Sequence, residues 1–325
     1  MLLSCLLFLA GCALLPFTFV TLLTHATDGR LVTASLNRQG CGKPAPIAPG
    51  TKKIEFIDSG GLMRSYLLYL PPDYRETTHY PLVLDFHGYG SNPFIQARVS
   101  GFTTLAREQN FIVAYPWGAI GPDRNIGWAT GLPGRAHVND VLFVSDVLRH
   151  LQATVCINPQ RIFATGFSNG GGMTNLLACK LAGRIAAFAP VSGSYPPAPG
   201  GCTPRRPVSI LEFHGTADPI VPYMGSHRRK EPPIMLWLQQ WASRDGCTKG
   251  PSMFYRSQNV IGEEWTSCRG GVVVIGYRIL GEGHWWPHIL INLRSGNALA
   301  SYTASQVIWS FFQAHPLPSS RKSGK

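Results

Sequence analysis

The sequence predicts an α/β domain with a central, mostly parallel sheet flanked by helices. Short continuous apolar runs, typical of strands buried on both faces of a sheet, alternate with helical stretches along the chain. Of the 325 residues, 45% are hydrophobic and 14% are charged, so the chain can bury a large core and is unlike a disordered protein. With no internal repeat or low-complexity linker, we expect a single domain over residues 51–316.

The expected strands are short runs of aliphatic and aromatic residues that end at glycine, proline or polar residues. One of them leads directly into Gly166, and the last is rich in β-branched residues and bounded by glycines. In chain order the runs are 65–70, 82–86, 111–115, 161–165, 186–191, 208–213 and 272–279.

The helical stretches lie between and after these runs. Asn139 can cap a helix that reaches about residue 154, with Asp140 and Asp146 expected on its surface. Further helices are expected at 169–181 and 234–241. The strongest amphipathic pattern comes last, because apolar residues recur there at i, i+3, i+4, i+7 and i+8. These residues are Ala304, Val307, Ile308, Phe311 and Phe312.

The beginning of the chain predicts export from the cell. Residues 2–23 are almost wholly apolar and precede Thr24-His25-Ala26, a small-x-small site that a signal peptidase can cut. We interpret 1–26 as a secretion signal, 27–50 as an irregular N-terminal arm and 317–325 as a basic tail. The signal has no basic n-region and is long enough to span a bilayer, so an uncleaved membrane anchor is the alternative.

Cysteine usage also favours a secreted, extracellular protein. Two of the eight cysteines lie in the signal, and an even number beyond a signal favours disulfides formed in an oxidising compartment. Sequence alone cannot fix the pairing, although short separation favours Cys179–Cys202 and Cys247–Cys268, which leaves Cys41–Cys156. None of these cysteines has zinc-ligand spacing, and we expect no metal.

The net charge of +12 is consistent with a solvated basic surface or with attraction to acidic polymers. The chain has no basic helix, zinc-finger spacing or aromatic RNA-binding motif, so we do not expect nucleic acid as a partner.

The sequence Gly166-Phe167-Ser168-Asn169-Gly170 fits the pattern G-x-S-x-G between an expected strand and an expected helix. A sharp turn there holds the Ser168 hydroxyl out of the chain, and the glycines allow neighbouring backbone to approach. The helix N-terminus places a positive dipole end where negative charge develops. The pattern therefore predicts Ser168 as a nucleophile.

A serine nucleophile needs a histidine as base and an acid that orients it. Where the serine lies in a G-x-S-x-G turn between a strand and a helix of an α/β sheet, the acid and then the histidine follow it along the chain. Asp218 and His284 each lie on a loop after an expected strand, where catalytic groups gather in such sheets. Their structural alternatives are a turn aspartate and a histidine hydrogen-bonded in a turn. Other candidates are less well placed: His288 and His315 for the base, and Asp245, Glu263, Glu264 and Glu282 for the acid.

Acyl transfer also needs donors for an oxyanion. We expect the backbone N–H groups of Asn169, which follows the nucleophile, and of Tyr89, in the loop after strand 82–86. Trp117, Trp128, Trp285 and Trp286 are candidates for lining a substrate cleft, with core packing as the alternative. This chemistry requires no metal and no organic cofactor.

Four segments together resemble carbohydrate esterase family one and the related polyhydroxybutyrate-depolymerase-like esterases, which have the α/β-hydrolase fold. They are PLVLDFHGYGSN at 81–92, RIFATGFSNGGGMTNLLAC at 161–179, LEFHGTADPIVPY at 211–223 and GEGHWWP at 281–287. The resemblance covers about residues 40–315 and is greatest to fungal feruloyl esterases. It implies a secreted serine esterase that cuts ferulate or acetate esters from plant cell-wall polysaccharide, with the triad at Ser168, Asp218 and His284.

The leading hypothesis is therefore a monomeric feruloyl esterase that acts on cell-wall polysaccharide or small esters, with no membrane partner once the signal is cleaved. An acetylxylan esterase or a polyester (hydroxybutyrate) depolymerase with the same triad is the alternative. A hypothesis of a different class, a non-catalytic wall-binding module, is disfavoured because such modules typically lose a triad residue.

Overall fold

The computed structural model describes residues 40–131, 138–288, 291–295 and 298–318, all within a compact unit that spans Arg38–Lys325. The expected signal and most of the expected N-terminal arm and basic tail lie outside the described residues. Within the described part of the chain, no helix combines the length and the apolar character needed to cross a bilayer.

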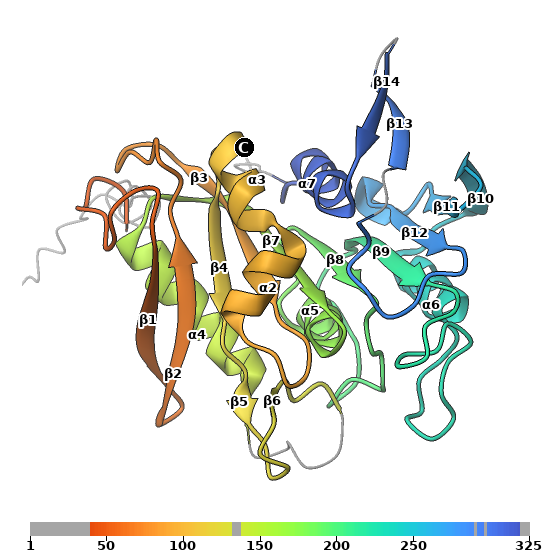
Figure 1. Cartoon of the computed structure of the whole chain (residues 1–325), viewed down its shortest axis with the longest axis horizontal. Helices are drawn as coiled ribbons and strands as arrows, with labels where there is room; N and C mark the ends of the chain where they lie inside the picture. The colour runs from red at the N-terminus through yellow and green to blue at the C-terminus, as the bar shows by residue number, and fades with distance from the viewer. Residues whose placement is uncertain (1–39, 132–137, 289–290, 296–297, 319–325) are drawn as a thin grey trace, which may run out of the picture. The chain divides into compact units, whose positions relative to one another are not determined.

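A 10-stranded sheet runs through the unit in the order β1-β2-β4-β3-β7-β8-β9-β12-β11-β10 (Figure 1). The central strands pair in parallel, whereas both edges are antiparallel. This confirms the expected mostly parallel sheet. The central strands are β4 (Ile112–Pro116), β3 (Tyr80–Phe86), β7 (Ile157–Phe167), β8 (Ala187–Val191), β9 (Ser209–Gly215) and β12 (Val274–Ile279). The edge strands are β1 (Lys52–Ser59), β2 (Leu62–Tyr69), β11 (Val260–Thr266) and β10 (Lys249–Arg256).

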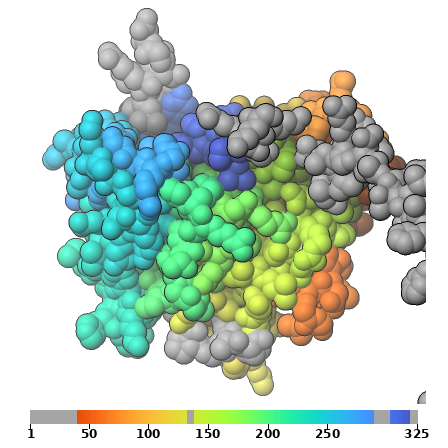
Figure 2. Space-filling model, turned by 180° about the vertical axis from the view of Figure 1, so that it is seen from behind, coloured from red at the N-terminus to blue at the C-terminus, as the bar shows by residue number. Residues whose placement is uncertain are grey.

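Helices cover both faces of the sheet (Figure 1). On one face lie α4 (Asp140–Thr154), α5 (Asn169–Lys180) and α6 (Ile234–Asp245). On the other lie α2 (Pro93–Ser100), α3 (Phe102–Gln109) and α7 (Ala304–Ala314). The remaining elements are the pairs β5 (Ala119–Ile120) with β6 (Ile126–Gly127) and β13 (Ile291–Ser295) with β14 (Ala298–Tyr302), and the short helix η1 (Arg269–Gly271). Seen from behind, the residues coloured green lie on the surface between those coloured cyan and those coloured yellow-green (Figure 2).

The two helical layers explain the continuous apolar runs. In β3, Leu82 and Leu84 belong to the core under α4 and α5, whereas Val83 between them belongs to the core under α3 and α7. Successive side chains of a strand point to opposite faces, so a strand covered on both faces is apolar at most positions.

The expectation that Asp140 and Asp146 lie on the surface of their helix is wrong. Both are buried, because α4 packs against β1. Asp140 accepts hydrogen bonds from Arg64 Nη2 and from the Ala129 N–H, each at 2.8 Å, and Asp146 accepts one from Ser59 Oγ at 2.8 Å. These carboxylates tie the helix to the antiparallel edge of the sheet.

Three disulfides join Cys41 to Cys156, Cys179 to Cys202 and Cys247 to Cys268. This is the pairing that short sequence separation favours. The first fastens the segment before β1 to the start of β7, and the other two fasten the ends of α5 and α6 to neighbouring loops.

Candidate active site

Ser168 occupies a tight turn between β7 and α5. Its φ of 57° and ψ of −118° are unusual for a residue with a side chain, and such conformations cluster at functional sites. Backbone bonds hold the turn, because the Ser168 N–H donates to Val191 O at 2.9 Å and Ser168 O accepts from Gly172 N–H at 3.0 Å. The flanking glycines are required: a Cβ on Gly166 would lie 2.6 Å from Gly170 O, and one on Gly170 would lie 2.0 Å from Phe86 O.

We expect Gly170→Ala to destabilise the protein by about 3 kcal/mol or more, because β3 and α5 must move apart to admit the methyl group. Gly183→Ala is the matched control, since a Cβ there meets nothing within 4 Å. Urea denaturation of both variants measures the difference. Equal stability of the two would show that the turn does not need close backbone approach.

Asp218 and His284 are in contact at the carboxyl ends of β9 and β12. His284 Nδ1 lies 2.7 Å from Asp218 Oδ2, and Asp218 Oδ1 accepts from the N–H groups of Ile220 and Val221, each at 2.8 Å. Burial alone would raise the pKa of Asp218, but the contacts with His214, 3.3 Å from Oδ2, and with His284 outweigh it and hold that pKa well below its usual range. Asp218 is therefore an anion that orients the imidazole.

Ser168 lies beside this pair at the same edge of the sheet. The ring of its neighbour Phe167 is 4.8 Å from the His284 ring, centroid to centroid. The Ser168 hydroxyl and the His284 ring, both among the described residues, do not share a hydrogen bond in this conformation. Catalytic hydrogen bonds are often long in unliganded enzymes and tighten when substrate binds.

The loop after β3 packs against the serine. A Cβ on Gly88 would lie 3.4 Å from Ser168 Cβ. His87 anchors the loop: the Gly118 N–H donates to its Nε2 at 3.0 Å, which leaves the proton on Nδ1 to donate to Gly88 O at 2.7 Å. Burial lowers the pKa of His87 to about 4, so the ring is neutral at physiological pH. Tyr89, the other expected oxyanion donor, is the next residue along this loop.

Sequence analysis missed the residues that join the two expected oxyanion donors. Asn169 begins α5, so its backbone N–H has no partner within the helix. Its side-chain oxygen accepts from the Trp128 N–H at 2.7 Å, and the Trp128 indole donates to His87 O at 2.8 Å. Trp128 therefore connects the helix start to the loop after β3. The prediction that Trp128 lines a substrate cleft is wrong, because its side chain is fully buried between these two segments.

An open cavity of about 1130 Å³ lies beside His284, and most of its wall is apolar. Trp285 is 64% exposed at its rim, whereas Trp286 is buried and donates its indole N–H to Ser305 Oγ at 3.0 Å. Trp117 is half-buried and contacts Phe94 edge-on. Of the tryptophans expected to line a substrate cleft, Trp285 is therefore the best placed to contact a ligand, whereas Trp286 serves mainly in packing. The cavity is lined by Val99, Phe167, Pro219, Ile220, Glu282, Gly283, His284, Trp285, Trp286 and His288.

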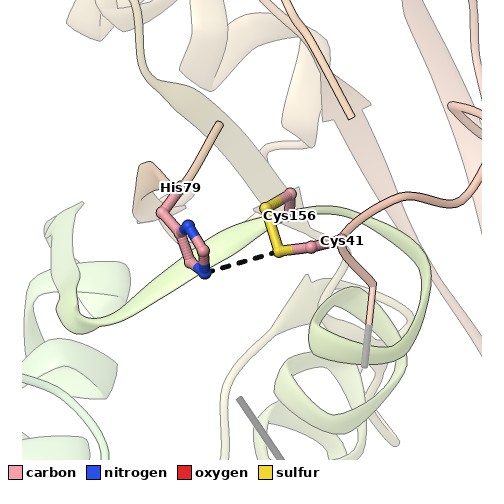
Figure 3. A group of neighbouring side chains, drawn as sticks. All are labelled: Cys41, His79 and Cys156. Atoms are coloured by element: carbon pink, nitrogen blue, oxygen red, sulfur yellow. Dashed lines mark hydrogen bonds between the residues drawn. A yellow bond between two sulfur atoms is a disulfide. The ribbon is translucent and has the colours of Figure 1, made fainter. Parts of the chain in front are cut away.

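A second group of residues has the composition of a metal site, but its sulfur atoms are already bonded. His79 Nε2 lies 3.6 Å from Cys41 Sγ, and Cys41 forms a disulfide with Cys156 (Figure 3). Cysteine binds metal as a thiolate, so this cluster offers no thiolate ligand.

Known proteins resemble the chain in sequence and in fold. A family described as Phospholipase/Carboxylesterase matches residues 138–250. Feruloyl esterase B of Piromyces equi is 32% identical over 237 residues, which are 68% of this chain and 42% of that protein. The chain thus spans less than half the length of that relative. Feruloyl esterase D of Neurospora crassa is 30% identical over 216 residues, which are 63% of this chain and 69% of that protein.

Solved structures share the fold. The acetyl xylan esterase from Aspergillus awamori superimposes with a TM-score of 0.53 at 15% identity, covering 72% of this chain and 94% of the other. At that identity the likeness bears on the fold, and it supports the α/β-hydrolase architecture.

Proposed function

The chain belongs to the feruloyl esterase family of carboxylic ester hydrolases, and on that premise we propose that it is a secreted serine esterase that removes feruloyl groups from plant cell-wall polysaccharide. The observation that carries the proposal is the large apolar cavity beside the His284–Asp218 pair. An acetyl group would leave most of it empty, whereas a hydroxycinnamoyl ring can use its aromatic and aliphatic wall.

In the proposed mechanism, His284 takes the proton of Ser168 as the hydroxyl oxygen attacks the ester carbonyl. Asp218 stabilises the imidazolium, and the backbone N–H groups of Asn169 and Tyr89 bind the tetrahedral oxyanion. His284 then gives the proton to the departing sugar oxygen, which leaves an acyl-enzyme. Water attacks this ester with His284 again as base, releasing ferulate and restoring Ser168.

Export of the protein is part of the proposal. Three disulfides suit an oxidising compartment, and polysaccharide is met outside the cell. The positive net charge of +12 suits approach to a wall matrix that carries uronates.

The test compares methyl ferulate, acetylated xylan and hydroxybutyrate oligomers as substrates of the purified protein. We expect the highest kcat/KM for methyl ferulate. Trp285→Ala should lower that value about tenfold and leave acetate release little changed, because the indole contacts only the longer acyl group. Phe56→Ala on β1 is the matched control, since Phe56 is also 64% exposed but lies on an edge strand away from the cavity.

Preferential hydrolysis of acetylated xylan would assign the chain to acetyl esters. Hydrolysis of none of the three esters, with polysaccharide binding retained, would contradict the proposed enzyme and favour a wall-binding module.

A further inference from the structure

A line of buried polar groups continues behind Asp218, away from His284. His214 Nε2 lies 3.3 Å from Asp218 Oδ2, the same oxygen that faces His284. On the other side of its ring, His214 Nδ1 lies 2.8 Å from Glu212 Oε1. Glu212 and His214 are both fully buried in β9. The proposed mechanism uses neither of them.

The partners of His214 determine where its protons lie. Nε2 is 2.9 Å from the carbonyl oxygen of Val221, which can only accept, so Nε2 carries a proton. Nδ1 faces a carboxyl oxygen, so one more proton is shared between Glu212 and His214. If it resides on His214, a cation lies against Asp218. If it resides on Glu212, both partners are neutral.

The geometry favours the cation, because a carboxylate oxygen lies at each ring nitrogen of His214, at 2.8 Å and 3.3 Å. Burial alone lowers the pKa of His214, but the charge of Glu212 and the contacts with both carboxylates outweigh it and raise that pKa to about 10. Burial also raises the pKa of Glu212, whose Oε2 has no hydrogen-bond partner among the described residues, but the contact with His214 opposes that rise. Arg278 lies beside His214 across the β9–β12 register, but Glu263 pairs with it at 3.0 Å. Two tyrosines also face the pair: Tyr195 donates to Glu212 Oε1 at 3.3 Å, and the Tyr223 ring meets the His214 ring edge-on. Glu231 acts on Tyr195, and His284 contacts Asp218, so both lie one residue farther from the pair.

We propose that Glu212 and His214 form a buried ion pair that positions Asp218 and lowers the basicity of His284. His214 would be a positioning residue, since it acts through Asp218 and not on substrate. Two backbone N–H groups hold Asp218 Oδ1. The charged His214 ring lies 3.3 Å from Oδ2, the oxygen that faces His284, and attracts it electrostatically, because the Nε2 proton itself is donated to Val221 O. The positive end of the pair is nearer to His284 than the negative end, so it opposes protonation of that ring. This inference rests on the proposed function, in which His284 is the base.

The decisive variant is Glu212→Gln. The amide can donate to Nδ1 of a neutral His214, which preserves the shape and the hydrogen bond but removes both charges. We expect the acidic limb of the pH profile of kcat/KM to move upward by about 0.5 to 1 pH unit, because His284 then binds its proton more tightly. Asp245→Asn is the control, since it makes the same exchange at a buried carboxylate on α6 and should leave the limb in place.

An unchanged limb in Glu212→Gln, whether or not the overall rate falls, would overturn the proposal. A second measurement covers the case in which the variant does not fold. In wild-type protein with ¹⁵N-labelled histidine, one ring should stay protonated on both nitrogens at about pH 8.5, where ordinary histidines are neutral. Absence of such a ring would also overturn it. This NMR result does not depend on ester hydrolysis, so failure of the proposed function, seen as an inactive wild type, remains distinguishable.

Discussion

Replacing Ser168 with alanine is expected to lower kcat for methyl ferulate by about 10³-fold to 10⁶-fold while KM changes little. The variant has no oxygen to form the acyl-enzyme, and the remaining rate comes from the oxyanion donors and from substrate binding. The turn should survive, because its backbone bonds to Val191 and Gly172 do not use the side chain. Steady-state kinetics on methyl ferulate measures the loss, and mass spectrometry after rapid quenching should find the acyl adduct only in the wild type.

Ser192 provides a matched control. It lies on the loop after β8, also has a positive φ of 46°, and donates its hydroxyl to Trp285 O at 3.1 Å. Ser192→Ala should therefore lose only the part of activity that depends on the position of Trp285, roughly a few-fold. If Ser192→Ala abolished hydrolysis and Ser168→Ala retained it, the assignment of the nucleophile would be wrong.

The sequence predicted the parts of the fold that are buried on both faces. The seven apolar runs correspond to β2, β3, β4, β7, β8, β9 and β12, because a strand buried on both faces is apolar at most positions. The exposed strands β1 and β10 were missed for the opposite reason. β10 exposes nearly every side chain, so it carries no hydrophobic pattern, and β1 is exposed along much of its length. Helices α2 and α3 were missed because they are short and separated only by Gly101, which adopts the left-handed conformation.

The residues of the candidate site also fall into a group that the sequence predicted and a group that it did not. Ser168, Asp218 and His284 could be selected because each follows a recognisable strand, and the structure places all three at the carboxyl edge of the sheet. The residues that support them carry no such signal. Trp128, His87 and Glu212 act through hydrogen bonds between segments far apart in the chain, and only the folded arrangement brings these together. The burial of Trp286 was likewise beyond prediction, because a tryptophan beside the loop of the proposed base can face a ligand or the core.

Asp218→Asn should lower kcat by about 10⁴-fold with little change in KM. The oxygen of the new amide is expected to stay with the two backbone donors of Ile220 and Val221, which places its NH₂ group against His284 Nδ1. That nitrogen must then accept, so the imidazole proton moves to Nε2, the atom that has to take the proton of Ser168. Rates measured across pH on methyl ferulate check this, and a loss of less than about tenfold would show that Asp218 is a turn residue only.

The Tm of the Asp218→Asn variant should also differ from that of wild type in a way that depends on pH. Because the pKa of Asp218 in the folded protein lies below its value of 3.8 in the unfolded chain, the ionised carboxylate contributes stability above that pH and loses it as the pH falls through the folded pKa. Asp218→Asn should therefore have a clearly lower Tm than wild type at pH 7, and the difference should shrink as the pH falls below about 4. For Asp245→Asn we expect the opposite pH dependence: the Tm of the variant relative to wild type should rise as the pH rises toward 7. Burial raises the pKa of Asp245 to about 7, so its charged form destabilises the fold as the pH rises toward 7. A Tm difference for Asp218→Asn that was constant with pH would mean that lost packing, and not the hydrogen-bonded charge, explains the effect.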